Sequence, residues 1–323
     1  MRRKLQDYAF SKVEIRILRG VANENHSLYM LKKNLSIKPT LLSHNLKSLL
    51  KKNIITLRKK TKTGRKRKKF RKYVYFSDSK HASLLRELLV TDSHMKWENI
   101  LSGLGIEVLF QVLGNSEITF ENFSKATFWR YSRDLMSQGI VKLDDHGYGI
   151  NPRFSILMTF LREYQRFILN TRIRSASEKA VLLWQKGFDC LIRMPRNPGF
   201  LKEGFLKTAT SALHDYGIQI LSDFDIYLFS RRKERIRLED VILHTLLIEK
   251  GNVRYVIYSL LLLRKYWTRI DKEYLLKEAQ RLDSSLQINA MFQFLETRGE
   301  RRGLTLPTWA EFMEKAEEYN VVV

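Results

Sequence analysis

Residues 54–76 read I-I-T-L-R-K-K-T-K-T-G-R-K-R-K-K-F-R-K-Y-V-Y-F, and this stretch decides how the N-terminal part of the chain folds. Eleven of the fifteen residues from Arg58 to Lys72 are lysine or arginine, and none is acidic. That much like charge needs a polyanion or open solvent around it. The β-branched and aromatic residues on both sides predict strands, with Gly64 between them. The stretch therefore predicts a β-hairpin with a basic tip.

Three short helices are predicted ahead of this hairpin. Apolar spacing predicts the first over Ser11–Arg19, which Gly20 is expected to end, and the second over Leu28–Leu35. Pro39 suits the first turn of a third helix that runs to about Lys52, because the amide hydrogen that proline lacks would have no partner there. This order of helices and hairpin is typical of a winged helix-turn-helix, whose third helix enters the major groove of DNA.

The third predicted helix has one apolar face and one polar face. Its apolar stripe consists of four leucines: Leu42, Leu46, Leu49 and Leu50. Its polar face carries side chains suited to base edges and phosphates: Thr40, Ser43, His44, Lys47 and Lys51. The hairpin supplies the candidate phosphate contacts: Arg58, Lys59, Lys60, Lys62, Arg65, Lys66, Arg67, Lys68, Lys69 and Arg71.

Other interpretations of these patterns stay open. A helix of this kind also fits a solvated surface, and a basic run also fits a nuclear-type targeting signal or an RNA-binding arm. The strands predicted on both sides argue against a free arm, whereas RNA binding remains an alternative because both polymers carry phosphate.

The charge of the chain is concentrated in this first block. The formal net charge is +24. Residues 1–90 hold 25 lysines and arginines against 5 acids, a net of +20, and residues 91–323 hold 33 against 29, a net of +4. A basic block joined to a nearly balanced remainder is typical of a phosphate-binding module attached to another domain.

Several classes of protein are disfavoured. Cys190 is the single cysteine, which excludes an intrachain disulfide and a cysteine-based zinc site, and its apolar neighbours indicate an inert core thiol. The N-terminus has basic residues without an apolar signal core, and the longest apolar run, Tyr255–Leu263, is too short to cross a membrane. The sequence therefore indicates a cytoplasmic protein.

A second module with the same order is predicted over residues 91–152. It comprises a helix, a short strand, a brief helix at Phe123, a recognition-like helix and a hairpin: Ile106–Leu113, Ile118–Phe120, Thr127–Gln138, and Ile140–Leu143 with Tyr148–Ile150. The hairpin tip carries Asp144 and Asp145, which repel phosphate. The module is therefore expected to be a structural or dimer-forming spacer, and Arg130 and Arg133 are secondary candidates for DNA contact.

Residues 153–199 are predicted to be a central helical segment and linker, in which Leu157, Leu161, Tyr164 and Ile168 form a seam. Residues 200–323 form the last domain. Strands are expected at Gly217–Ile220, Ile226–Phe229 and Arg235–Arg237, with a helical array after them. The fold class is α+β and mostly helical, with tandem winged helix-turn-helix modules followed by the C-terminal domain.

Four motifs carry a resemblance to a known family. They are G-F-L-K-T-A-T-S-A-L-H-D-Y-G-I at 204–218, L-E-D-V-I-L-H-T-L-L at 238–247, Y-S-L-L-L-L at 258–263 and L-P-T-W-A-E-F at 306–312. They resemble winged-helix transcriptional regulators of archaeal type with a nucleotidyltransferase-like C-terminal domain, as in AbiEi-type antitoxins. The resemblance implies DNA-binding regulation, with the C-terminal α/β domain used for assembly or ligand sensing.

That resemblance raises an enzymatic alternative. Active nucleotidyltransferases pair a Gly-Ser turn with Asp-x-Asp and a third acid, which hold Mg²⁺ against nucleotide phosphates. Here Thr210-Ser211 replaces the turn, Asp223 and Asp225 form Asp-x-Asp, and Glu239 or Asp240 would be the third acid. Without the glycine, close phosphate approach is lost, so the domain is expected to be degenerate.

The polar residues around this motif have structural explanations. Asp223 and Asp225 are expected to be turn or capping residues, and Glu239 and Asp240 supply charge at a helix N-terminus. His244 is expected to be a packed, hydrogen-bonded histidine, although it lies one turn from Asp240 and could pair with it.

The sequence thus predicts a regulator that binds specific double-stranded DNA, with neither catalytic nor metal-binding residues and no cofactor. A homodimer on a pseudo-palindrome is expected, because two half-sites double the length of sequence read. The basal transcription machinery or a toxin are further partners to consider, which leaves an antitoxin that regulates its own synthesis as an alternative.

Overall fold

The computed structural model describes residues 8–62, 69–114, 124–145, 147–197, 199–200, 202–230, 233–299 and 305–323. Helices and a smaller share of strands occur throughout, which confirms a mostly helical α+β protein. The chain divides into two compact units, residues 1–168 and 169–323. Among the described residues, no helix has both the length and the apolar character needed to cross a membrane.

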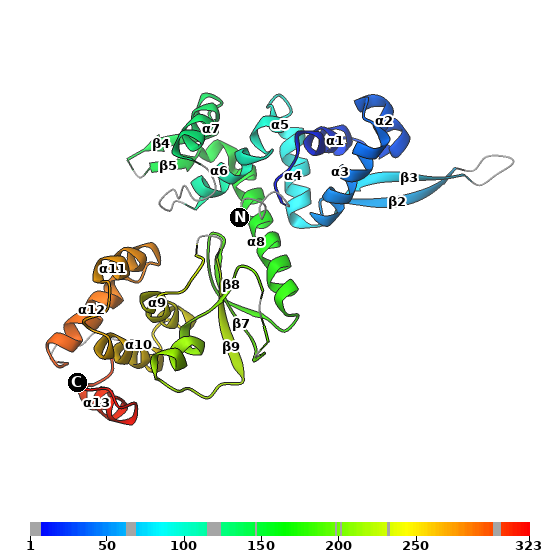
Figure 1. Cartoon of the computed structure of the whole chain (residues 1–323). Helices are drawn as coiled ribbons and strands as arrows, with labels where there is room; N and C mark the ends of the chain where they lie inside the picture. The colour runs from blue at the N-terminus through cyan, green and yellow to red at the C-terminus, as the bar shows by residue number, and fades with distance from the viewer. Residues whose placement is uncertain are drawn as a thin grey trace. The chain divides into compact units, whose positions relative to one another are not determined.

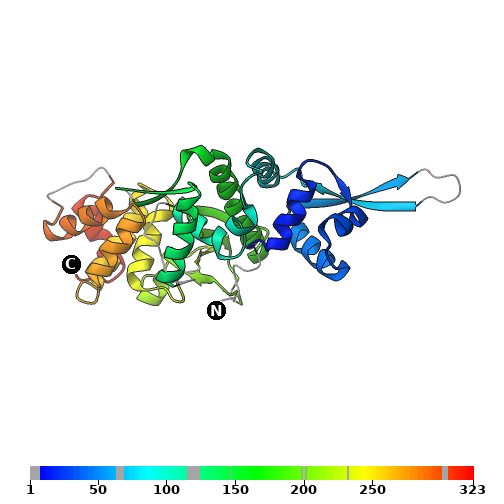
Figure 2. The same ribbon diagram turned by 90° about the horizontal axis from the view of Figure 1, so that it is seen from above.

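The first unit begins with three helices, a three-stranded sheet and a fourth helix. In chain order these are α1 (Lys12–Ala22), β1 (His26–Ser27), α2 (Leu28–Leu35), α3 (Pro39–Lys51), β2 (Ile55–Lys62), β3 (Lys69–Phe76) and α4 (Lys80–Thr91). The sheet is antiparallel in the order β1-β3-β2. In both views β2 and β3 extend beyond the helices as a two-stranded arm (Figures 1 and 2). The predicted second and third helices and hairpin strands are therefore confirmed.

Local sequence explains where these helices begin. Ser11 caps α1 by accepting the Glu14 amide hydrogen, while the Glu14 carboxylate accepts the Ser11 amide hydrogen, which forms a capping box. Ser27 caps α2 through one bond, in which its hydroxyl oxygen accepts the Met30 amide hydrogen. Pro39 occupies the first turn of α3, as expected.

The prediction that Gly20 ends the first helix is wrong. The helix α1 continues through Gly20 to Ala22, and both Val21 and Ala22 are buried. A side-chain carbon at Gly20 would lie 3.6 Å from the side chain of Leu31 on α2. That distance is an ordinary van der Waals contact, so the position has room for a side-chain carbon. Burial of the last turn outweighs the low helix propensity of glycine.

The rest of the first unit contains more helices and a second hairpin. These are α5 (Trp97–Ile100), α6 (Leu104–Leu113), α7 (Lys125–Ser137), β4 (Val141–Asp144), β5 (Gly147–Ile150), the short 3₁₀ helix η1 (Pro152–Phe154) and α8 (Ser155–Ala176), which continues past the division of the units. The predicted helices at 106–113 and 127–138 and the hairpin are confirmed. The strand expected at 118–120 and the helix at 123 fall outside the described residues.

A four-stranded antiparallel sheet and a set of helices form the second unit. Its elements are β6 (Val181–Lys186), β7 (Asp189–Pro195), β8 (Phe205–Lys207), the 3₁₀ helix η2 (Ala209–Tyr216), β9 (Phe224–Phe229), α9 (Leu238–Ile248), α10 (Val253–Lys265), α11 (Lys272–Arg281), α12 (Ser285–Glu296) and α13 (Trp309–Glu318). The strand order is β6-β7-β9-β8. One large apolar core joins η2, the sheet and α9 to α13, and a smaller one includes Leu169, Ile173 and Cys190.

The helical assignment of residues 181–195 is wrong. These residues form β6 and β7, joined at Gly187, whose φ of 59° suits the tight turn between them. The strand β7 is central, because it also pairs with β9. A run of leucines next to Trp184 fits either a strand or a helix, and the distant partner β9 decides in favour of the strand.

Two of the three strands expected in the last domain are also wrong. Gly217 adopts a left-handed conformation that ends η2, and residues 218–220 continue as loop. Arg237 is the N-cap of α9, so residues 235–237 lead into a helix. The expected strand at 226–229 is confirmed as part of β9.

Candidate nucleic-acid interface

The helix α3 is held in place by polar contacts on its buried side. The Ser11 hydroxyl donates to the Asn45 side-chain oxygen at 2.7 Å, and the Asn45 amide donates to the Leu41 carbonyl oxygen at 2.7 Å. Lys52, the C-cap of α3, donates from Nζ to the Ala9 carbonyl oxygen at 2.8 Å. These contacts orient α3 against the start of α1.

Lys52 and Glu14 form a buried ion pair. The Lys52 Nζ lies 2.7 Å from Glu14 Oε2, and both side chains are 2% exposed. The Nζ atom also lies 5.0 Å from the centre of the Phe10 ring. The His81 Nε2 atom is 3.1 Å from the Lys52 carbonyl oxygen, and burial lowers the pKa of His81. A buried histidine kept neutral here suits donation to that carbonyl.

The opposite side of α3 is polar and faces solvent. Leu42, Leu46 and Leu49 are buried, as the pattern predicts. The candidate base-contacting residues are all exposed: Thr40, Ser43, His44, Lys47 and Lys51. Leu50 departs from the prediction, since it is 39% exposed rather than part of the core. The buried position on that side belongs to Asn45, which uses its amide for the contacts described above.

The strands β2 and β3 place cations directly opposite one another. The antiparallel register pairs Lys59 with Lys72, Lys60 with Arg71, and Lys62 with Lys69. Like charges directly across a strand pair destabilise it. An arm built in this way gains stability when a polyanion neutralises it.

The described basic side chains of the arm are accessible. Lys59, Arg71 and Lys72 are exposed. Arg58 is also exposed, and it lies 5.2 Å from the Tyr75 ring centre and 3.5 Å from the Asp78 carboxylate. Of the predicted phosphate contacts, Arg65, Lys66, Arg67 and Lys68 lie outside the described residues, and Lys60, Lys62 and Lys69 are described in their backbone only.

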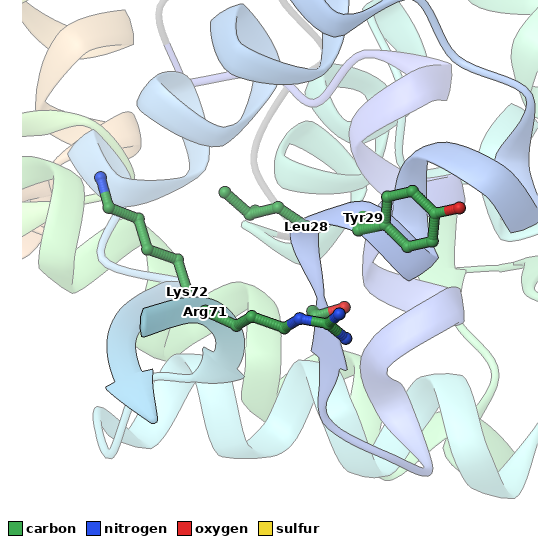
Figure 3. A pocket seen from close by; sticks show the side chains of 5 residues that line it. Leu28, Tyr29, Arg71 and Lys72 are labelled. Carbon is green, nitrogen blue, oxygen red and sulfur yellow. The ribbon is translucent and has the colours of Figure 1, made fainter. Parts of the chain in front are cut away.

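A small pocket connects the arm to α2 (Figure 3). It has a volume of about 290 Å³ and is lined by Ser27, Leu28, Tyr29, Arg71 and Lys72. In Figure 3, Arg71 and Lys72 leave β3 in opposite directions. Tyr29 is 65% exposed, and no sequence pattern singled it out. Its position in the first turn of α2, just after the capping serine, is the signal that could have identified it.

The second hairpin differs in charge from the first. Asp144 and Asp145 are exposed at its tip, and the Lys142 Nζ lies 2.8 Å from the Asp144 carboxylate. Arg130 and Arg133 are exposed on α7, and the Arg130 guanidinium lies 5.4 Å from the Tyr131 ring centre. Both arginines are accessible, whereas the tip is unsuited to phosphate.

Three of the four acids of the enzymatic alternative, Asp225, Glu239 and Asp240, contact other groups of the chain. Asp225 lies buried on β9, where its carboxylate is 3.3 Å from the Lys207 Nζ. It is thus a strand residue, which corrects the expectation of a turn or cap. Asp223 is exposed before the strand. Glu239 accepts the Asp271 amide hydrogen at 2.8 Å.

Asp240 belongs to a polar cluster around α9 and α11. Its carboxylate accepts the Arg237 amide hydrogen at 2.9 Å, which confirms its role at the start of α9, and it also contacts the Lys233 ammonium. Arg281 bridges Asp189 at 3.2 Å and Glu278 at 2.9 Å. Within the described ranges, no three histidine, cysteine or acidic residues are grouped so that they could hold a metal ion.

His244 is packed inside the second unit, as predicted. Its Nδ1 atom lies 2.8 Å from the Thr208 hydroxyl, and burial lowers the pKa of His244 to about 4. Cys190 is fully buried, and burial raises the pKa of its thiol to about 12, which suits an inert core residue.

The burial of His244 predicts a loss of stability in acid. Its folded pKa of about 4 lies below the unfolded value of 6.5. The unfolded chain therefore binds the extra proton first, and stability falls as pH drops from about 6.5 to about 4, by roughly 3 kcal/mol. Hydrogen exchange of α9 peptides should show the loss. His244→Gln should flatten this dependence while His214→Gln, at an exposed site, should not; equal slopes in both variants would refute the assignment.

Comparison with known proteins reaches only the second unit. The family model HVO_2833_C, C-terminal, matches residues 202–321. No curated protein and no solved structure matches the chain. The matched segment is thus similar to that family over η2, β8, β9 and the helices that follow.

Proposed function

We propose that this protein is a transcriptional regulator that binds specific double-stranded DNA through a winged helix-turn-helix in its first unit. The order α1-β1-α2-α3-β2-β3 and the sheet order β1-β3-β2 support this architecture. In the proposal, α3 enters the major groove and the arm of β2 and β3 acts as the wing on phosphates.

The observation that carries the proposal is the facing cations of the arm. Three cross-strand pairs of lysine and arginine stand in register next to a helix whose exposed face is small, polar and basic. A solvated hairpin gains nothing from such repulsion, whereas a phosphate backbone lying along it converts the repulsion into binding energy.

Substitutions on α3 test the sequence-reading part of the proposal. Replacing Ser43, His44 or Lys47 with alanine should change which duplex is preferred, by about 1–3 kcal/mol for each bidentate interaction with a base that is removed. Selection of bound genomic fragments followed by footprinting would measure the preference. Ser83→Ala, at an exposed position on α4, is the control and should keep the parental preference. An α3 variant that binds all duplexes with the parental ranking would show that α3 does not read bases.

For the second unit we propose a nucleotidyltransferase-like architecture without catalysis, used for assembly of a homodimer or for sensing. The architecture is supported by the contact between η2 and β9, where the Ser211 hydroxyl oxygen accepts the Ile226 amide hydrogen. The absence of catalysis is supported by the ion pair that Asp225 forms with Lys207. Mg²⁺-dependent transfer from a nucleoside triphosphate that is lost in Asp225→Ala would overturn it.

A further inference from the structure

The first unit contains a cavity far larger than the pocket beside the arm. It has a volume of about 730 Å³ and lies between the start of α1, the segment around α5, and α7. Small-molecule sites have volumes of roughly 300–1,000 Å³. The cavity shares no lining residue with the pocket of Figure 3.

Three cations from separate elements line this cavity. Lys12 belongs to α1, Lys96 precedes α5, and Arg130 lies on α7, while Asp134 is the one acid in the lining. In the part of the chain that the structure describes, none of the three cations has an ion-pair partner. Asp134, one turn from Arg130 on α7, offsets part of this charge, and the three cations still leave excess positive charge in the lining for an anionic ligand.

The other lining residues suit the uncharged part of an organic ligand. Ile100 and Leu135 are buried apolar residues of the lining, Tyr131 is an aromatic ring, and Asn99 and Gln138 supply amide groups. An apolar wall, an aromatic face and a few polar groups are the usual composition of a ligand site. Three cations in addition favour a ligand with phosphate groups.

We propose that this cavity binds a small organic phosphate of nucleotide size. Lys12, Lys96 and Arg130 hold the phosphate groups, and Tyr131 with the apolar wall holds the organic part. A concave site lined by residues of three elements suits a small molecule. A DNA duplex instead contacts protein surfaces that protrude into its grooves or follow its backbone. The site does not depend on the proposed DNA-binding function.

Binding of ADP, ribose 5-phosphate and pyrophosphate to the full-length chain would test the proposal by calorimetry, at about 0.15 M salt. Because the basic arm attracts any polyanion, the titrations use a chain in which residues 65–69 are all glutamine. One equivalent of ADP should bind, and adenosine should bind far more weakly. The combined change Lys12→Gln, Lys96→Gln and Arg130→Gln should weaken ADP binding by at least about tenfold.

A matched variant removes the same charge elsewhere in the first unit. It combines Arg16→Gln, Lys125→Gln and Arg162→Gln, three exposed positions outside the cavity. It should keep the parental affinity for ADP. The proposal is overturned if none of the three phosphate compounds binds with a Kd below about 1 mM, or if both triple variants lose binding to the same extent. Loss of DNA binding with retained ADP binding would refute the proposed function and leave this site intact.

Discussion

Replacing Lys59, Arg71 and Lys72 with glutamine should weaken DNA binding on the order of 10²–10³-fold at 0.1 M salt, while the protein becomes no less stable. Each phosphate contact contributes about 0.9 to the slope of log affinity against log salt. Removal of three phosphate-binding cations should therefore make the slope shallower by up to about 2.7. The decrease in affinity should be similar for every duplex, since phosphates carry no direct sequence information.

The stability part of this prediction follows from the register of the arm. Lys59 faces Lys72, and Arg71 faces Lys60, so the substitutions remove repulsion between neighbouring strands. Relief of such pairs is worth roughly 0.2–1 kcal/mol each. Urea unfolding and fluorescence anisotropy on the same samples would measure both effects.

A control variant separates local from general charge. Lys250→Gln, Arg269→Gln and Lys277→Gln remove three charges at exposed positions of the second unit. DNA affinity should then change much less than in the arm variant. If the two variants lose DNA affinity equally, the arm does not contact phosphates specifically, and the net charge of the chain alone explains binding.

The second large effect should come from the buried ion pair behind α3. Lys52→Met leaves the Glu14 carboxylate buried without its cation, which should lower the free energy of unfolding by about 3–5 kcal/mol. The Ala9 carbonyl oxygen loses its Lys52 donor as well. Urea unfolding at neutral pH would measure the change.

A double replacement tests whether the pair itself is responsible. Glu14→Leu combined with Lys52→Met removes both charges, so the double variant should be more stable than Lys52→Met alone. The partly exposed pair of Lys80 and Glu163, 2.9 Å apart, is the comparison. Because Glu163 keeps its second partner Arg166, Lys80→Met should cost at most about 1 kcal/mol. Glu14→Leu also removes the capping box of α1, so equal losses in Lys52→Met and in the double variant would show that the cap or the packing, and not the unpaired charge, dominates there.

Local signals were sufficient to predict much of the first unit. Pro39 at the start of α3 and β-branched strands around a basic run identify their elements without help from distant residues. The buried ion pair between Lys52 and Glu14 could not be predicted from local sequence signals. Lys52 appears as one more cation after a polar helix face, and only the fold brings it to Glu14.

Prediction failed where distant pairing decides the structure. Residues 181–195 become strands because β7 lies between β6 and β9, and β9 comes about thirty residues later in the chain. The strand β1 is only two residues long and exists through its pairing with β3. The cavity lined by Lys12, Lys96 and Arg130 could not be predicted from the sequence either, because its cations come from three separate elements.

The dependence of DNA affinity on salt tests the central claim most directly. If the arm and α3 neutralise about 6–10 phosphates, the affinity of the intact chain for a selected duplex should fall by about 10³–10⁵-fold between 50 and 200 mM salt. The preference for the selected duplex over a scrambled one should persist across this range. An affinity that does not change with salt, or no binding to any duplex at 50 mM salt, would contradict the account.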